Sequence, residues 1–257
     1  MSYALELTGL RKSFGGKVAV DQLHLAVPTG VLFGLVGPNG AGKTTTLAMA
    51  TGLLRPDAGS AYVLGNDVWE NPARAKAGMG VMADGMRLFD RLSGRELLRY
   101  MGLLRKMEPA EIDRRSRELL DTLGLSGDAD LVVADYSAGM KKKISLACAL
   151  LHAPGLLVLD EPFESVDPVS GEVIRTILRN YVRAGGTVVL SSHVMELVEH
   201  LCDGVGVIAD GRVLAVGATQ DVCNGLSLQE RFLALVGISS GSGEGGLTWL
   251  QSSSDSN

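Results

Sequence analysis

A glycine-rich stretch near the start of the chain has the residue types and spacing of a phosphate-binding loop. It consists of Gly37, Pro38, Asn39, Gly40, Ala41, Gly42, Lys43 and Thr44, which match the pattern GxxxxGK[ST]. Glycines let backbone N–H groups turn inward around phosphate oxygens at the positive end of a helix. In this pattern the lysine reaches the β- and γ-phosphates, and the threonine hydroxyl binds Mg²⁺. The sequence therefore predicts a site for a nucleoside triphosphate and Mg²⁺.

Two adjacent carboxylates follow an apolar run in the second half of the chain. Residues 156–159 are all apolar, and Asp160 and Glu161 come directly after them. Successive side chains of a strand point to opposite faces, so the two acids can have separate roles. We assign Asp160 as a metal ligand and Glu161 as the group that positions and polarises an attacking water. An isolated Asp-Glu pair is usually part of a solvated loop, but a phosphate loop in the same chain favours the hydrolytic interpretation.

The elements around these residues are predicted to place both groups at one edge of a sheet. Residues 31–36 are almost wholly apolar, as in a strand covered on both faces, and a helix is expected from 44 to about 53. The glycine stretch thus lies between a strand and a helix, which argues against an ordinary glycine turn. The two acids emerge where the strand at 156–160 ends, which is the ligand-binding edge of an α/β sheet.

The remaining pattern predicts an α/β fold with a helical insertion. Short β-rich runs come first, at 3–10, 17–27 and 60–64. Helical periodicity at 93–106 and 109–123 indicates a helical subdomain over about 84–155. Strands and helices then alternate, with strands at 187–191, 205–209 and 212–216 and helices at 169–184 and 194–201. This alternation predicts a mostly parallel sheet.

Composition restricts the partners that we expect. The 257 residues are 46% hydrophobic and carry a net charge of −5. Because the chain has no surplus of basic residues to bind phosphate backbones, we do not expect nucleic acid as a partner. Residues 1–10 lack the pattern of a secretion signal, and the apolar tract 144–159 is interrupted and too short for a membrane helix. We therefore expect a cytoplasmic protein. The Ser/Gly-rich residues 239–257 are expected to form a flexible tail.

Four further segments make the chain resemble the ATP-binding subunits of ATP-binding cassette (ABC) transporters. The segments, in chain order, are Phe14, residues 136–140 (Tyr-Ser-Ala-Gly-Met), residues 164–168 (Glu-Ser-Val-Asp-Pro) and Ser192-His193. They look like the adenine-stacking aromatic, the signature motif, the D-loop and the switch histidine of that family. The likeness covers residues 3–217, and the ordered set is what separates this family from other P-loop proteins.

The resemblance implies a P-loop NTPase (RecA-like) core with an N-terminal antiparallel β subdomain, in one ATPase domain over residues 1–238. It implies ATP and Mg²⁺ as cofactors, held by Phe14, the glycine stretch and Thr45 of one subunit. Ser137 and Gly139 of a second ATP-binding subunit, arranged head to tail, would complete the site. His193 would hold Glu161 and the water in line, and Asp167 would touch the opposite subunit. A separate transmembrane permease subunit would keep the chain at the cytoplasmic face of the membrane.

Two positions depart from the family's pattern, and one run of three lysines conflicts with a local rule of helix formation. Ala138 replaces a glycine of the signature motif, which adds one methyl group beside the nucleotide. Asp84 occupies the Q-loop position, where the family typically has glutamine; it can still give Mg²⁺ an oxygen, but it adds a negative charge near the phosphates. Residues 141–143 are three lysines at the start of a helix, where the dipole disfavours cations, and we interpret them as a solvated face in preference to a nucleotide or partner contact.

Two other functions compete with the transporter interpretation. One is a soluble ABC ATPase that acts on ribosomes or other proteins, and the other is a regulator that binds ATP without turning it over. The chain has a single cassette and no long coiled coil, and Glu161 and His193 are both present, which disfavours these alternatives. The Tyr-Ser-x-Gly-Met-Lys signature resembles the multidrug and antibiotic export branch, so we expect export.

Overall fold

The computed structural model describes residues 2–85 and 88–237. The predicted tail at 239–257 lies outside this range. Over the described residues, the larger sheet has six strands in the order β10-β9-β3-β8-β7-β6. Their bounds are β3 Leu32–Val36, β6 Met79–Met82, β7 Leu156–Leu159, β8 Thr187–Ser192, β9 Gly204–Ala209 and β10 Arg212–Ala218. All neighbouring pairs are parallel except β9 with β10, which confirms the mostly parallel sheet.

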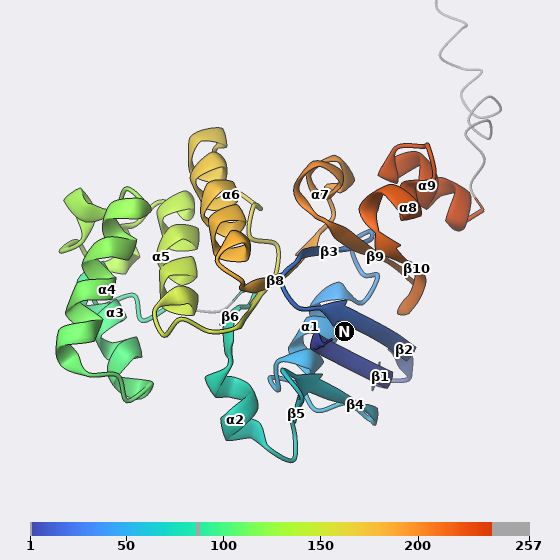
Figure 1. The fold of residues 1–257 in the computed structure, drawn as a ribbon, viewed down its shortest axis with the longest axis horizontal. Helices are drawn as coiled ribbons and strands as arrows, with labels where there is room; N and C mark the ends of the chain where they lie inside the picture. The colour runs from blue at the N-terminus through green and yellow to red at the C-terminus, as the bar shows by residue number, and fades with distance from the viewer. Residues whose placement is uncertain (1, 86–87, 238–257) are drawn as a thin grey trace, which may run out of the picture.

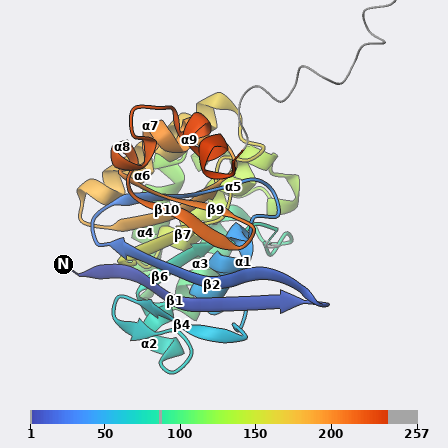
Figure 2. The same ribbon diagram turned by 90° about the vertical axis from the view of Figure 1, so that its right-hand side faces the viewer.

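A second, antiparallel sheet lies against the larger one (Figure 2). Its order is β2-β1-β4-β5, and its strands are β1 Tyr3–Phe14, β2 Lys17–Pro28, β4 Ala58–Val63 and β5 Asn66–Asp67. Helix α1 (Lys43–Ala50) contacts both β1 and β4 of this sheet. The N-terminal part of the chain is therefore the antiparallel β unit that the family resemblance implied.

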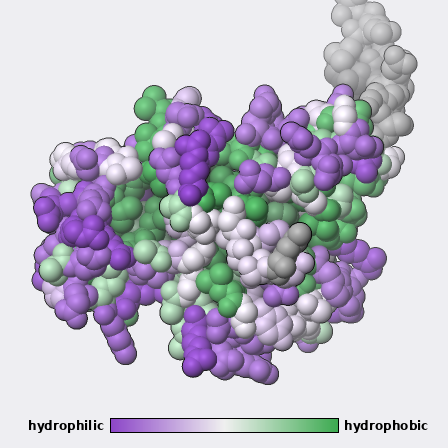
Figure 3. All heavy atoms as spheres, in the orientation of Figure 1, coloured by the Kyte–Doolittle hydropathy of each residue, from purple (hydrophilic) through white to green (hydrophobic). Residues whose placement is uncertain are grey.

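Helices α3 (Gly94–Leu104), α4 (Pro109–Thr122) and α5 (Ala138–Leu150) pack together on one side of the molecule (Figure 1). Ser93 and Glu96 form a capping box at the start of α3, and Pro109 occupies the first turn of α4. These local signals explain why the predicted helices at 93–106 and 109–123 are confirmed within a few residues. Hydrophilic side chains dominate the surface of this side in Figure 3.

Helices α6 (Pro168–Arg183) and α7 (Met195–Leu201) also match the predicted segments. The sequence patterns did not predict α2 (Pro72–Ala77), α8 (Thr219–Cys223) or α9 (Leu228–Leu235). These three helices are short, with at most eight residues each, so hydrophobic periodicity has too few turns to stand out. Within the described part of the chain, no helix is both long and apolar enough to cross a bilayer.

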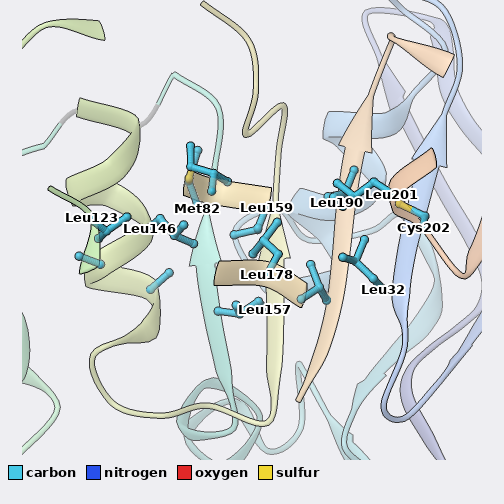
Figure 4. Packing of buried hydrophobic residues seen from close by; sticks show 14 of the residues in the cluster. Leu32, Met82, Leu123, Leu146, Leu157, Leu159, Leu178, Leu190, Leu201 and Cys202 are labelled. Atoms are coloured by element: carbon cyan, nitrogen blue, oxygen red, sulfur yellow. The ribbon is translucent and has the colours of Figure 1, made fainter. Parts of the chain in front are cut away.

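Burial on both faces of the larger sheet explains its apolar strands. In β7, Leu157 and Leu159 belong to the core on the side of α5 and α6 (Figure 4), whereas Leu156 and Val158 belong to the core beneath the antiparallel sheet. Alternate side chains of one strand thus fill two different cores, so every position must be apolar. The same constraint makes all five residues of β3 buried.

We expect Leu190→Ala to lower the free energy of unfolding by about 2–5 kcal/mol, because it leaves a cavity in a close-packed core. Leu190 is fully buried on β8, between β3 and β7. The matched control is Leu214→Ala on β10, where the leucine is 37% exposed and the change should stay within about 1 kcal/mol. Denaturant unfolding of both variants checks this, and equal destabilisation would contradict the core assignment.

Candidate functional site

The phosphate loop connects β3 to α1, as its sequence pattern requires. Gly42, the residue before α1, has a φ of 102°, and the helix has no side-chain cap. A Cβ at Gly42 would lie 2.6 Å from the Ala19 carbonyl oxygen, and one at Gly37 would lie 2.1 Å from that of Ile208. Larger residues would therefore displace neighbouring backbone at both positions. The first-turn N–H groups of α1 remain free of side-chain caps, so they suit an anion.

Lys43 is a buried cation whose ammonium group lies across the loop. Its side chain is 6% exposed, and Nζ donates to the carbonyl oxygen of Gly37 at 2.8 Å and lies 3.3 Å from that of Pro38. Nζ also lies 3.5 Å from Oε1 of Glu161. The lysine thus joins the loop to the end of β7, and it places positive charge where the pattern predicts phosphate oxygens.

The two carboxylates at the end of β7 have different surroundings. Asp160 is 3% exposed and accepts a hydrogen bond from the Ser191 hydroxyl at 2.5 Å. Glu161 is 12% exposed and projects toward the loop, where Oε2 lies 3.0 Å from Nδ1 of His193. The structure therefore gathers Lys43, Glu161 and His193 around one point, although they are far apart in the sequence. The sequence patterns did not identify Ser191 as part of the site. The one feature that pointed to it is the pair of serines, Ser191 and Ser192, at the end of a mostly apolar strand.

A cleft of about 430 Å³ lies over this group. Its lining consists of Phe14, Lys17, Ala19, Asn39, Gly40, Ala41, Gly42, Lys43, Thr44, Thr45, Asp84, Glu161, Glu164 and His193. Phe14 is 51% exposed at the end of β1, so its ring is open to a ligand. Lys17, the first residue of β2, also lines the cleft, although the sequence patterns did not predict it. The predicted site residues Gly37, Pro38 and Asp160 do not line the cleft.

Asp84 lies at the edge of the cleft and has a partner that the sequence did not identify. Its carboxylate is 3.7 Å from Nζ of Lys142 on α5. Nζ of Lys142 also donates to the backbone carbonyl of Glu161 at 2.9 Å. The prediction of a solvated face is therefore wrong for Lys142, whose side chain is only 19% exposed. The carboxylate and the carbonyl supply negative charge that offsets the unfavourable position of a cation in the first turns of a helix.

Ser137 and Gly139 lie at the start of α5 and do not line the cleft of their own chain. The Ser137 hydroxyl caps the helix by accepting from the N–H of Met140 at 3.2 Å. A Cβ at Gly139 would lie 3.1 Å from Oδ2 of Asp167, which itself caps α6. Hydrogen bonds from Ser170 hold the pKa of Asp167 below its usual range. The start of α5 and the D-loop thus form one packed surface.

The residues present suit a Mg²⁺–nucleotide ligand. Thr44 and Asp160 offer hydroxyl and carboxylate oxygens, which are the ligands that this hard cation prefers. Over the described residues, no group of three His, Cys, Asp or Glu side chains is placed to hold a metal by itself. Mg²⁺ in proteins is commonly held by one or two side chains together with phosphate oxygens and water, and the arrangement here fits that mode.

Comparison with known proteins agrees with this site. Residues 20–164 match the family described as ABC transporter. The chain is 36% identical to the linearmycin resistance ATP-binding protein LnrL of Bacillus subtilis (strain 168), over 86% of this chain and 71% of the relative. It is 39% identical to the daunorubicin/doxorubicin resistance ATP-binding protein DrrA of Streptomyces peucetius, over 87% and 68%. It is also 40% identical to the Nod factor export ATP-binding protein I of Sinorhizobium fredii (strain NBRC 101917 / NGR234), over 83% and 62%.

Solved structures give the same result. One described as the structure of an ATP binding subunit of an ABC transporter superposes with a TM-score of 0.84 at 28% identity, covering 91% of this chain and 99% of that one. The family match covers more than half of the chain and includes both the phosphate loop and the carboxylate pair. The chain therefore belongs to the ABC transporter family, as one of its ATP-binding proteins with a P-loop NTPase fold.

Proposed function

We propose that this chain hydrolyses ATP to power export through a separate transmembrane permease subunit. The observation that carries the hydrolytic part is the meeting of Lys43, Glu161 and His193 beside the phosphate loop. A binding module without turnover would not need a carboxylate held between a lysine and a histidine at this position.

In the proposed reaction, the backbone of the phosphate loop and the ammonium group of Lys43 bind the phosphates of ATP. Mg²⁺, when bound by Thr44, Asp160 and the phosphate oxygens, would neutralise charge that develops on them. The Glu161 carboxylate orients and polarises the attacking water, because it faces the cleft and is fixed on both sides by Lys43 and His193. The ring of Phe14 stacks on the adenine. Asp84 lies at the cleft edge, where it could add an oxygen ligand to the metal.

The site needs a second ATP-binding subunit, which can be another copy of this chain or a paralogue. Ser137 is exposed at the start of α5 and Gly139 is buried two residues further along, and neither residue lines the cleft of its own chain. A helix N-terminus with a free hydroxyl hydrogen suits the γ-phosphate bound by a partner. The head-to-tail dimer is therefore the arrangement in which each start of α5 closes the cleft of the other subunit.

Export is supported by what the relatives are named for. Two of them are resistance proteins, and another is named for Nod factor export. We accordingly place the chain at the cytoplasmic face of the membrane, bound to its permease. A soluble ABC ATPase acting on ribosomes or other proteins remains the competing function, but the relatives' names do not favour it.

Replacing Glu161 with glutamine should leave ATP binding intact and lower turnover by about 10²-fold or more, because the amide keeps the shape but cannot polarise water as a base. The measurements are nucleotide affinity and steady-state phosphate release. Glu118→Gln on the exposed face of α4 is the control and should behave like the natural chain. Near-normal hydrolysis by the Glu161 variant would remove this residue from the reaction.

Asp84→Gln should preserve or raise ATPase activity. The amide removes one negative charge beside the triphosphate, and it keeps an oxygen for the metal and for Lys142. Phosphate release measured over a range of Mg²⁺ concentrations checks this. A collapse in turnover with an unchanged unfolding midpoint would show that the carboxylate itself is required.

Cell fractionation tests the transport proposal. With the permease present, the chain should pellet with membranes and resist a salt wash, and without it the chain should remain in the supernatant. In this proposal the permease is what attaches the chain to the membrane. If the chain stays in the supernatant in both cases, or sediments with ribosomes, the competing function would replace the transporter assignment.

A further inference from the structure

The backbone of Glu161 has an unusual conformation for a residue with a side chain. Its φ is 46°, in the left-handed region that L-residues rarely adopt. This conformation turns the carboxylate away from the strand direction of β7 and toward Lys43 and His193. A strained conformation of this kind persists only when the surrounding groups hold it in place. The position of the Glu161 carboxylate therefore depends on the groups that bind its backbone as well as on the groups that bind the carboxylate itself.

The first holding group is the Ser191 hydroxyl, on the neighbouring strand β8. Ser191 is completely buried, and its Oγ accepts a hydrogen bond from the N–H of Glu161 at 2.9 Å. The same hydroxyl donates its hydrogen to Oδ1 of Asp160 at 2.5 Å. One side chain thus fixes the backbone of the water-orienting residue and the carboxylate of the proposed metal ligand. It does so while using both its donor and an acceptor position.

The second holding group is Lys142, which belongs to a different part of the fold. Its Nζ donates to the carbonyl oxygen of Glu161 at 2.9 Å from the second turn of α5. The N–H and C=O of Glu161 are therefore both bound by side chains, one from each side. Neither hydrogen bond is part of a helix or sheet ladder. Without the Ser191 hydroxyl, the N–H of Glu161 would lack a partner in the described structure, and without Lys142 the C=O would keep only the N–H of Glu164, at 3.2 Å.

We propose that Ser191 and Lys142 are positioning residues that clamp the backbone of Glu161, so that its carboxylate stays in line for hydrolysis. This inference rests on the proposed role of Glu161 as the water-orienting group. Lys142 lies on the helix that starts with the signature motif, and it also contacts Asp84 at the Q-loop position. The clamp therefore ties the reacting carboxylate to the start of α5 and to the Q-loop position.

The test uses pairs of variants that differ in one property. Ser191→Val and Ser191→Thr place side chains of nearly equal shape on β8, but only threonine retains the hydroxyl. Lys142→Met keeps the length of the side chain and removes the donor. Ser116→Ala, which deletes a buried hydroxyl without a partner on α4, and Lys143→Met on the same helix as Lys142 are the controls. Each variant is assayed as the full chain for ATP affinity, unfolding midpoint and single-turnover hydrolysis per bound ATP.

Ser191→Val and Lys142→Met are expected to slow hydrolysis per bound ATP by about 10- to 100-fold, the range typical of a misplaced reacting group. The ATP affinity of Lys142→Met should change little, because this side chain neither lines the cleft nor contacts Asp160. Ser191→Thr should hydrolyse ATP faster than Ser191→Val, and both controls should match the natural chain. Asp84→Gln should not reproduce the Lys142→Met defect, since the clamp acts through the Glu161 carbonyl.

Unchanged hydrolysis per bound ATP in Lys142→Met and in Ser191→Val would overturn the clamp, even if the unfolding midpoint falls, because that pattern indicates a merely structural role. An equal defect in Ser191→Thr and Ser191→Val would overturn the part assigned to the hydroxyl. If Ser191→Val does not fold because Ser191 is buried, Lys142→Met tests the clamp instead, since Lys142 is partly exposed. Near-normal turnover in Glu161→Gln would instead contradict the proposed function, so the two failures can be told apart.

Discussion

The parallel pairing of β3, β7 and β8 is the constraint on which the site depends. In this pairing Leu35 lies opposite Ser191, and Leu159 lies opposite Leu190. Because parallel strands run in the same direction, the segments that follow them emerge at one edge of the sheet. The phosphate loop after β3, the two acids after β7 and His193 after β8 are therefore brought to the same edge of the sheet. A shift of one residue in this register would turn alternate side chains into the wrong core and separate these groups.

The two-sided burial of the same strands explains why that register is well fixed. Each strand presents leucine and valine side chains to two cores at once, so a shift would have to disrupt both. The polar residues that contribute to the site lie at the carboxyl ends, as with Asp160 after β7 and Ser191 near the end of β8. The hydrophobic residues thus determine the position of the strands, and the strands determine the position of the chemistry.

The parts of the structure that sequence predicted well are those encoded by neighbouring residues. The phosphate loop is a contiguous pattern, the apolar runs of β3 and β7 mark buried strands, and Pro109 marks the start of a helix. The contacts of Ser191 and Lys142 escaped prediction because their partners are 30 and 19 residues away from them, at Glu161. A serine within a buried strand and a lysine in a basic run carry no local sign of such a partner. The short helices α2, α8 and α9 escaped for a different reason, since they depend on packing and not on periodicity.

The capping role of Ser137 has a consequence for what can be recognised at the start of α5. The oxygen of the Ser137 hydroxyl already accepts a hydrogen bond from the N–H of Met140. The hydroxyl therefore acts toward a bound molecule mainly as a donor, through its hydrogen. The nearby N–H groups of the helix start are donors as well, and the helix dipole adds positive potential. Apart from the neighbouring carboxylate of Asp167, the start of α5 therefore offers mainly donors to whatever approaches it. It can distinguish an acceptor-rich group, such as a terminal phosphate, from the donor-rich ammonium and guanidinium groups that are common on protein surfaces.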